Sequence, residues 1–299
     1  MIHISESDVL RLLPMRGCID QMRLVFDAIR IGRTINQPRR RLVLSTGSVL
    51  HQMAGAWEKY FATKIYSSNV RHGGLHEMIV LLYDAETGKP LAFIEANNLS
   101  LIRTGAATGY AVELLANPDA EILAIIGSGS QARAQVEAIR AARPIREVRV
   151  WSRHKENTRK FAEELNCTAV ESAEDAVRGA HIVVTATTAK EPVIVADWVS
   201  PGTFVAAMGS NVANRRELPE DLVKSAGLVV VDDMDQARVE AGDLLLAYNG
   251  TGSWNNVDTL DNITPGYDPS RITIFESLGI AVEDAAAAAY VYERAAMLP

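Results

Sequence analysis

The chain contains only two cysteines, Cys18 and Cys167, which are far apart and belong to no CxxC or Cys/His cluster. This shortage excludes a disulfide scaffold, argues against structural zinc, and favours a reducing compartment. No apolar run approaches the roughly 20 residues that a membrane helix needs. Because Met1 to Asp8 also lack the basic-then-apolar order of a signal peptide, we expect a cytoplasmic protein that does not bind a membrane.

Positive charge is not in excess either. The 299 residues include 30 Lys and Arg against 37 Asp and Glu, which gives a formal charge of -7. No global basic field therefore attracts nucleic acid, and any positive site must be local. What the sequence does have is 48% apolar residues, enough to bury the core of one large domain or of two moderate ones.

The first third of the chain mixes helical and strand patterns. Up to residue 30, aliphatic residues at helical spacing predict two short helices, with Ser5 as the first N-cap. Strand-like runs follow at 41–44, 63–66, 78–83 and 91–95. The last two flank a turn-rich spacer and predict a hairpin. We expect an α+β domain with a largely antiparallel sheet, followed by a helix of small residues at 103–116.

From residue 122 onward, strands alternate with helices. Apolar strands are predicted at 122–126, 148–151, 182–186, 204–208 and 228–231. This alternation is typical of parallel βαβ units and predicts an α/β fold with a doubly wound Rossmann domain. We expect that domain at 115–279, with a long loop at 248–270. Residues 1–114 and 280–299 would form the second domain, to which an alanine-rich terminal helix at 281–297 returns.

A glycine-rich motif joins the first strand of this region to the next helix. The sequence Gly127-Ser128-Gly129-Ser130-Gln131-Ala132 matches G-x-G-x-x-A. Gly127 permits the tight turn, Gly129 lets the backbone approach a pyrophosphate, and Ala132 keeps the helix close to the sheet. A purely structural turn is the alternative. Because strand, helix and next strand are in register, we favour dinucleotide binding at the helix amino terminus.

The end of the second strand bears on which dinucleotide binds. NAD sites usually have an acidic residue there, whereas NADP sites have Arg or small polar residues. Here the strand ends in Trp151-Ser152-Arg153-His154, without an acid. The guanidinium of Arg153 suits a 2′-phosphate, so NADP(H) is favoured and NAD(H) remains possible. Alternatively, Arg153 simply begins the next helix and faces water.

Three acidic residues near a later strand look at first like a metal site. Asp232, Asp233 and Asp235 follow the strand at 228–231. At that place in a βαβ unit, acidic residues more often cap the next helix. We therefore predict no metal.

Four segments, in this order, resemble the ornithine cyclodeaminase and mu-crystallin family: RTGAATG (103–109), GSGSQA (127–132), WSRHKEN (151–157) and ITIFESLGIAVED (272–284). The similarity extends over nearly the whole chain. It implies a Rossmann domain that carries a second, substrate-binding and dimer-forming domain built from both chain ends. A homodimer is therefore expected.

The resemblance also implies that an amino or imino acid is bound through its carboxylate, by Arg40, Lys64 and Arg103. A carboxylate desolvated beside a nicotinamide needs such compensating donors. Taken singly, Arg40 could belong to a solvated basic run, Lys64 to the surface, and Arg103 to a helix cap. For the rest of the substrate, we expect a pocket that includes Met53, Trp57 and the loop around Trp254.

Cofactor contacts follow from the resemblance in the same way. They fall on His76, Arg103, Gly127, Ser128, Gly129, Ser130, Gln131, Ser152, Arg153, His154, Asn157, Thr187, Thr188 and Ser277. For His76, a structural role is the alternative, because a histidine beside a strand more often bonds a backbone carbonyl than a ligand.

Two departures from the family decide the expected reaction. Cyclodeaminases have an aspartate where this chain has Asn211, and an amide cannot take up a proton as a carboxylate does. The mu-crystallin branch, which resembles ketimine reductases, also lacks that acid. Its FKSLG motif is FESLG here, so Glu276 replaces a lysine.

We therefore expect an NAD(P)H-dependent imine or ketimine reductase that converts a small α-imino acid to an amino acid and, in reverse, acts as an amino-acid dehydrogenase. Lys64, Arg103 and Asn211 are the expected catalytic residues, with Lys64 or a water as proton donor. Two alternatives stay open. One is a deaminating cyclase that uses bound NAD, and the other is a non-enzymatic protein that holds NADPH and a carboxylate ligand.

Overall fold

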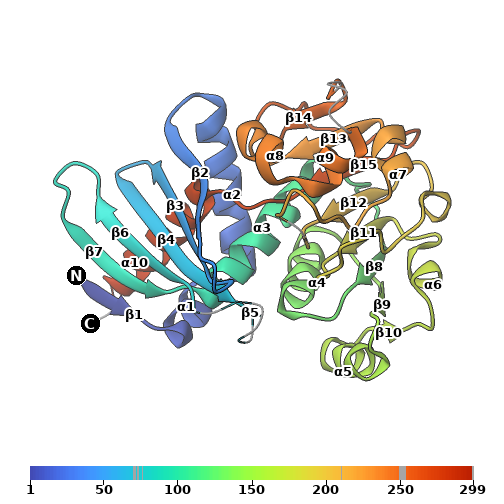
Figure 1. Cartoon of the computed structure of the whole chain (residues 1–299), viewed down its shortest axis with the longest axis horizontal. Helices are drawn as coiled ribbons and strands as arrows, with labels where there is room; N and C mark the ends of the chain where they lie inside the picture. Colours follow the sequence, from blue (N-terminus) through green and yellow to red (C-terminus); the bar gives the residue numbers. More distant parts are fainter. Residues whose placement is uncertain (70–71, 73, 76, 210, 249–253, 298–299) are drawn as a thin grey trace. The chain divides into compact units, whose positions relative to one another are not determined.

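The computed structural model of the chain describes residues 1–69, 72, 74–75, 77–209, 211–248 and 254–297. The chain divides into two compact units (Figure 1): unit 1 is Met1–Ala106 with Gly279–Pro299, and unit 2 is Ala107–Leu278. The division falls inside helix α3 (Asn97–Leu115), so that one helix supplies residues to both units. The sequence had suggested a division at the end of this helix.

Unit 1 is built on a mixed sheet with the strand order β1-β7-β6-β4-β3-β2, and β5 pairs with β4. The strands are β1 (Ile2–Ile4), β2 (Thr34–Val43), β3 (Val49–Trp57), β4 (Tyr60–Asn69), β5 (Gly74–Leu75), β6 (Ile79–Asp84) and β7 (Pro90–Glu95). β1 runs parallel to β7, and the other pairings are antiparallel. The predicted hairpin is confirmed as β6 and β7, whereas β3 was not predicted.

Helices cover one face of this sheet. They are α1 (Glu6–Leu12), α2 (Met15–Arg30), the first part of α3, and α10 (Ala281–Ala295). Ser5 caps α1 as expected, since its hydroxyl accepts from the Asp8 amide. Helix α10 lies against β3 and β4 (Figure 1). The approach is close because a side chain at Gly55 of β3 would meet the backbone of Ala281 and Val282 at 2.8 Å.

Unit 2 contains a parallel sheet with the strand order β10-β9-β8-β11-β12-β15-β13-β14. The strands are β8 (Ile122–Ile126), β9 (Glu147–Trp151), β10 (Thr168–Ala169), β11 (Ile182–Thr185), β12 (Phe204–Ala207), β13 (Leu228–Val231), β14 (Val257–Thr259) and β15 (Thr273–Glu276). The helices are α4 (Ser130–Ala142), α5 (Lys155–Leu165), α6 (Ala173–Val177), η2 (Ala196–Trp198), α7 (Glu220–Ser225), α8 (Met234–Glu240) and α9 (Gly242–Tyr248). This parallel arrangement confirms the Rossmann-like α/β class.

Several strands of unit 2, among them β8, β11 and β13, form where the sequence has aliphatic runs. Strands β11, β12 and β15 are buried at every position, as expected for parallel strands that are covered on both faces. Strand β14 lies within the segment that was expected to be a loop. Asp233 accepts from the Gln236 amide at 2.8 Å and caps α8, which confirms the expected capping role.

Two further observations concern the whole described chain. Cys18 is buried and Cys167 is half-buried, and both are free thiols. Among the described residues, no helix combines the length and apolarity needed to cross a membrane.

Candidate active site: a buried basic cluster and a glycine-rich turn

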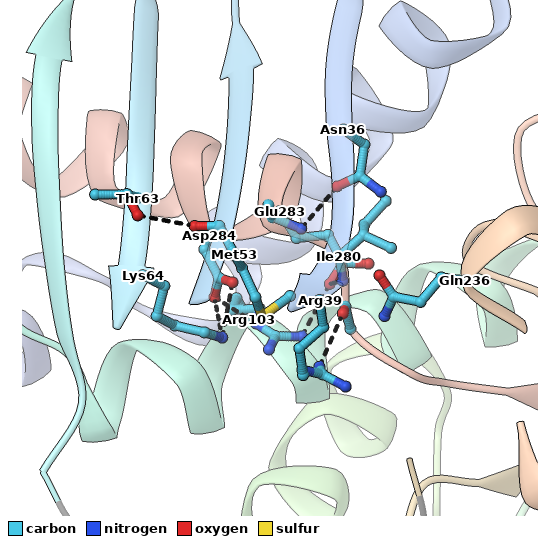
Figure 2. A network of polar contacts seen from close by, with 12 residues as sticks. Asn36, Arg39, Met53, Thr63, Lys64, Arg103, Gln236, Ile280, Glu283 and Asp284 are labelled. Carbon is cyan, nitrogen blue, oxygen red and sulfur yellow. Dashed lines mark hydrogen bonds and ion pairs between the residues drawn. The ribbon is translucent and has the colours of Figure 1, made fainter. Parts of the chain in front are cut away.

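Three basic side chains of unit 1 surround two acidic side chains of α10 (Figure 2). They are Arg39 from β2, Lys64 from β4 and Arg103 from α3, and with Glu283 and Asp284 they form what we call the basic cluster. Lys64 Nζ lies 2.9 Å from Asp284 Oδ1 and 2.7 Å from Oδ2. Arg103 Nε donates to Asp284 Oδ1 at 2.8 Å, and its Nη1 donates to Glu283 Oε2 at 2.9 Å. All five residues are buried.

Local structure explains how these side chains meet. Alternate residues of β4 face α10, and Lys64 is one of them, opposite Met53 of β3. Gly279 precedes α10 with a φ of +72°, and a side chain there would collide with the guanidinium of Arg103. Glycine at this position therefore leaves the space that Arg103 occupies.

The charges in the basic cluster do not balance, because three basic groups face two carboxylates. Burial lowers the pKa of Lys64 to about 7, with Arg103 acting in the same direction and Asp284 opposing it. Although burial raises the pKa of Asp284, the charges of Arg103 and Lys64 hold it below the usual value. The cluster is therefore suited to bind one more carboxylate and to exchange a proton near neutral pH.

The structure puts Arg39, and not the expected Arg40, in this cluster. The pairing of β2 with β3 shifts register between Gln37 and Arg40, at a bulge that contains Pro38. Arg40 is consequently exposed, opposite the exposed Gln52. Arg39 is only 8% exposed and its Nη2 donates to the Gly279 carbonyl at 3.3 Å. The bulge therefore places Arg39, the neighbour of the predicted residue, in the basic cluster.

Glu283 and Asp284 were not identified from the sequence. The available signal was a pair of acidic residues in the first turn of an otherwise apolar, alanine-rich helix. Acidic residues favour helix amino termini in general, so that position alone does not indicate buried partners.

The three residues expected around the rest of the substrate lie in different places. Met53 packs with Tyr66 and Ala281 in a small buried group beside Lys64. Trp57, at the other end of β3, instead lines a separate hollow of about 430 Å³ in unit 1. Trp254 belongs to unit 2, where it packs against the core of that unit. Of the two residues in unit 1, only Met53 is near the basic cluster.

The glycine-rich turn of unit 2 has the features that a dinucleotide requires. Gly127 has a φ of +122°, and a side chain there would collide with the Ala186 backbone. Gly129 is the N-cap of α4 and supplies no capping side chain, while no atom lies within 4 Å of the place where its Cβ would be. The amide groups at the start of α4 are therefore open to a pyrophosphate. Ala132 is fully buried, as expected for close packing.

Other predicted cofactor residues surround this turn. The Ser128 hydroxyl donates to Ser152 Oγ at 3.0 Å, which links the first turn to the end of β9. In the described part of the chain, Gln131 Nε2 is buried without a hydrogen-bond partner. Such an orphaned donor fits a site that is completed by a ligand. The exposed side chains near the turn are Ser130, Arg153, His154 and Asn157.

The remaining predicted residues follow other strands of the same sheet. Thr187 and Thr188 come after β11, Asn211 comes after β12, and Ser277 directly follows β15. Carboxyl ends of parallel strands share one edge, which is where Rossmann folds bind their ligands. Ser277 Oγ is buried without a hydrogen-bond partner among the described residues. His76, which was also predicted to contact the cofactor, lies outside the described residues.

Comparison with known proteins agrees with these features. Residues 2–297 match the ornithine cyclodeaminase/mu-crystallin family. A Delta(1)-pyrroline-2-carboxylate reductase from Bacillus cereus is 38% identical, covering 99% of this chain and 97% of that protein. The structure of the Thermococcus litoralis Delta(1)-pyrroline-2-carboxylate reductase in complex with NADH and L-proline has a TM-score of 0.93 and 30% identity, covering 99% of this chain and 98% of that chain.

An archaeal alanine dehydrogenase, solved as a dimer with bound NAD, has a TM-score of 0.92 and 29% identity. The match covers 99% of this chain and 96% of that chain.

Proposed function

Because this chain belongs to the ornithine cyclodeaminase/mu-crystallin family, we propose that it is an NAD(P)H-dependent reductase of a small α-imino acid, which yields an amino acid. The observation that carries the proposal is the basic cluster, in which three buried basic groups face two carboxylates. When Lys64 is protonated, the cluster carries an excess of one positive charge, which suits a monocarboxylate substrate. Relatives that reduce pyrroline-2-carboxylate support the same substrate class.

In this proposal, Arg39 and Arg103 bind the carboxylate of the substrate. Arg103 is oriented by Glu283 and Asp284, so its planar guanidinium is fixed before the substrate arrives. Met53 and Tyr66 are buried beside Lys64, and we assign them the apolar contacts with the rest of the substrate. A compact ring or short side chain, as in pyrroline-2-carboxylate, is the substrate class that we favour.

Lys64 is proposed as the proton donor. Its lowered pKa, near 7, lets the ammonium give up a proton at neutral pH, and the neutral amine can take one up in the reverse direction. Asp284 holds the amine in place through two close contacts. A bound nicotinamide supplies or accepts the hydride.

We propose that unit 2 binds the dinucleotide along the Gly127–Ala132 turn. Relatives of known structure bind NADH or NAD. For this chain we favour NADP(H), because no acidic residue ends β9 and Arg153 is exposed there, without a hydrogen bond or ion pair to any described residue. Its guanidinium is therefore available for a 2′-phosphate.

Asn211 is the reason for preferring reduction to cyclodeamination. Its amide cannot act as a base, so we assign it a role in hydrogen bonding and not in proton transfer. Among the described residues of the basic cluster, Asp284 is the only aspartate. It is paired with both Lys64 and Arg103, so it does not replace the missing base.

We also propose a homodimer. The sheet face of unit 1 that points away from α10 exposes apolar residues, among them Ile35 (65%), Leu42 (60%) and Phe61 (37%). Exposed apolar surface on one sheet face is typical of a subunit interface. A second copy of this chain is the occupant we favour, in line with the dimeric archaeal relative. Light scattering after gel filtration tests this directly.

The reaction is tested by following nucleotide absorbance at 340 nm with a panel of substrates. The panel contains pyrroline- and piperideine-2-carboxylate, and 2-oxo acids with ammonia or methylamine. We expect oxidation of NADPH, and more slowly of NADH, with at least one cyclic imino acid. Release of ammonia from ornithine without net change at 340 nm would instead support the cyclodeaminase. Tight nucleotide binding without turnover of any substrate would support a binding protein.

A further inference from the structure

A single buried acid joins two loops at the edge of the unit 2 sheet. Glu217 is 0% exposed. Its Oε1 accepts from the Thr187 amide and hydroxyl, both at 2.6 Å, and its Oε2 accepts from the Gly209 amide at 2.7 Å. The Glu217 carbonyl also accepts from the Val193 amide at 2.8 Å. Thr187 and Val193 belong to the loop after β11, and Gly209 begins the loop after β12.

The surrounding backbone is shaped around this carboxylate. A side chain at Gly209 would collide with the Glu217 carboxyl group and with the Thr187 carbonyl. Similarly, a side chain at Gly242, the first residue of α9, would collide with the Arg215 carbonyl. The Glu217 carboxylate therefore holds Gly209 close to it, and the backbone at Val212 and Arg215 packs against the start of α9.

Asp243 and Glu276 in turn hold Glu217. Asp243 Oδ1 accepts from the amides of Glu217 and Leu218, at 2.8 and 2.6 Å. Glu276, at the end of β15, is hydrogen-bonded to Asp243. A hydrogen bond between two carboxyl groups requires one proton. Burial, followed by the charges of Asp243 and Glu217, raises the pKa of Glu276, which favours the protonated form of this carboxyl group. Asp243 therefore stays an acceptor for both amides.

We propose that Glu217 is a positioning residue for dinucleotide binding, which fastens the loop carrying Thr187 and Thr188 to the loop carrying Asn211. This inference rests on the proposed function, because it assumes that these loops contact the nicotinamide dinucleotide. Glu276 takes part through Asp243, to which it is hydrogen-bonded. The competing explanation is that Glu217 stabilises the fold and has no effect on the bound dinucleotide.

The decisive variant is Glu217→Gln. An amide presents an NH₂ group either to the Gly209 amide or to the Thr187 amide, so at least one hydrogen bond is lost. In the free protein, we expect amide hydrogen exchange to accelerate about tenfold or more in residues 187–193 and 211–218. We also expect the Kd for NADPH, measured by the fluorescence of the bound nucleotide, to rise about tenfold or more. The KM for the imino acid should change less than the KM for NADPH.

Glu220→Gln is the matched control. Glu220 is a half-exposed carboxylate three positions further on, paired with Lys224 on α7, and its substitution should leave the exchange rates and the Kd unchanged. Equal changes in the exchange rates and in the Kd for NADPH in Glu217→Gln and Glu220→Gln would overturn the proposal. A lower Tm of Glu217→Gln with unchanged local exchange and unchanged Kd would also overturn it, because that is the result of a structural role alone.

A second pair of variants applies if Glu217→Gln does not fold. Thr187→Ser keeps the hydroxyl that donates to Glu217, whereas Thr187→Val removes it. We expect the valine variant to weaken NADPH binding and accelerate exchange in both loops, and the serine variant to restore both properties. Equal exchange rates and equal Kd values for NADPH in Thr187→Val and in the wild-type protein would contradict the proposal. The exchange measurement needs no ligand, so it tests whether Glu217 fastens the two loops even if the protein binds neither nucleotide and the proposed function fails.

Discussion

Lys64 Nζ lies 2.7 Å from Asp284 Oδ2, although the two residues are 220 positions apart in the sequence. Their side chains are 3% and 2% exposed. This pair brings an amine with a pKa near 7 next to a carboxylate and to the guanidinium of Arg103. The arrangement gives a testable pH dependence, and it makes unit 1 sensitive to small changes around Arg103.

The first prediction concerns the direction of the pH dependence. If Lys64 is the proton donor, kcat for imine reduction should fall as the pH rises through about 7, because the ammonium form is lost. Amino-acid oxidation should show the opposite trend, because it needs the neutral amine. Rates measured in both directions between pH 5.5 and 9 check this. Profiles with the same slope in both directions would remove Lys64 from proton transfer.

The second prediction is that Arg103→Lys weakens substrate binding. A lysine ammonium cannot bond Glu283 and Asp284 with the fixed fork of the guanidinium. We expect the KM for the imino acid to rise about tenfold or more, and the free energy of unfolding to fall by about 1–3 kcal/mol. Arg159→Lys, on the exposed face of α5, is the control and should change neither quantity. An unaltered KM in Arg103→Lys would exclude Arg103 as the anchor.

The third prediction uses two glycines with nearly the same backbone conformation. Gly279 has a φ of +72° and Gly88 a φ of +71°. Alanine at either position costs about 1–2 kcal/mol of stability through backbone strain. Only Gly279→Ala also displaces Arg103, since no atom lies within 4 Å of a side chain at Gly88. Steady-state kinetics should therefore show a raised imino-acid KM for Gly279→Ala alone. Equal KM values in the two variants would show that the position of Arg103 does not matter.

The fourth prediction addresses nucleotide choice. Arg153→Asp places an acid where NAD sites hold the ribose hydroxyls, and it repels a 2′-phosphate. The ratio of kcat/KM for NADPH to that for NADH should fall about tenfold or more. Lys160→Asp, further along α5 and exposed, should leave the ratio unchanged. A ratio that stays the same in Arg153→Asp would show that this side chain does not read the phosphate.

The fifth prediction concerns stability and the buried carboxyl groups of unit 2. Burial raises the pKa of Glu217 to about 7 and that of Asp243 to about 6, and it also raises the pKa of Glu276. Asp232 faces the same group and adds to the effect on Glu276, while Arg216 opposes it at Asp243. At these three carboxyl groups, the folded state therefore holds more protons than the unfolded state above about pH 4. Stability should decrease as the pH rises through 7, by on the order of 3 kcal/mol for Glu217 alone.

Thermal unfolding between pH 5 and 8 measures this decrease. Glu276→Gln keeps a donor to Asp243 but cannot ionise, so the Tm of this variant should fall less between pH 5 and 8 than that of the wild type. Glu220→Gln, which changes a half-exposed carboxylate, should follow the wild type. Equal changes in Tm between pH 5 and 8 in Glu276→Gln and in the wild type would show that the cluster is ionised at little cost.

The sequence was sufficient for the fold class because the aliphatic runs of unit 2 and its glycine-rich turn are local signals. Strand β3 was missed because Gly55 and its alanine neighbours hide the alternation of the strand. Glycine is nevertheless required there by the close approach of α10.

The residues of the candidate site could likewise be predicted only in part from the sequence. Lys64 and Arg103 were found through family motifs, whereas Arg39 depends on a bulge whose register is set by pairing with β3. Asp284 and Glu217 have partners far away in the sequence. No local pattern distinguishes such buried acids from ordinary surface acids before the strands are paired.

The most direct test of the central claim is the transfer of a label from the nucleotide to the substrate. NADPH deuterated at C4 of the nicotinamide is incubated with pyrroline-2-carboxylate, and the product is analysed by mass spectrometry. The account predicts proline with one deuterium at its α-carbon. Failure to form a labelled amino acid from this or any other imino acid of the panel, with nucleotide bound, would contradict it.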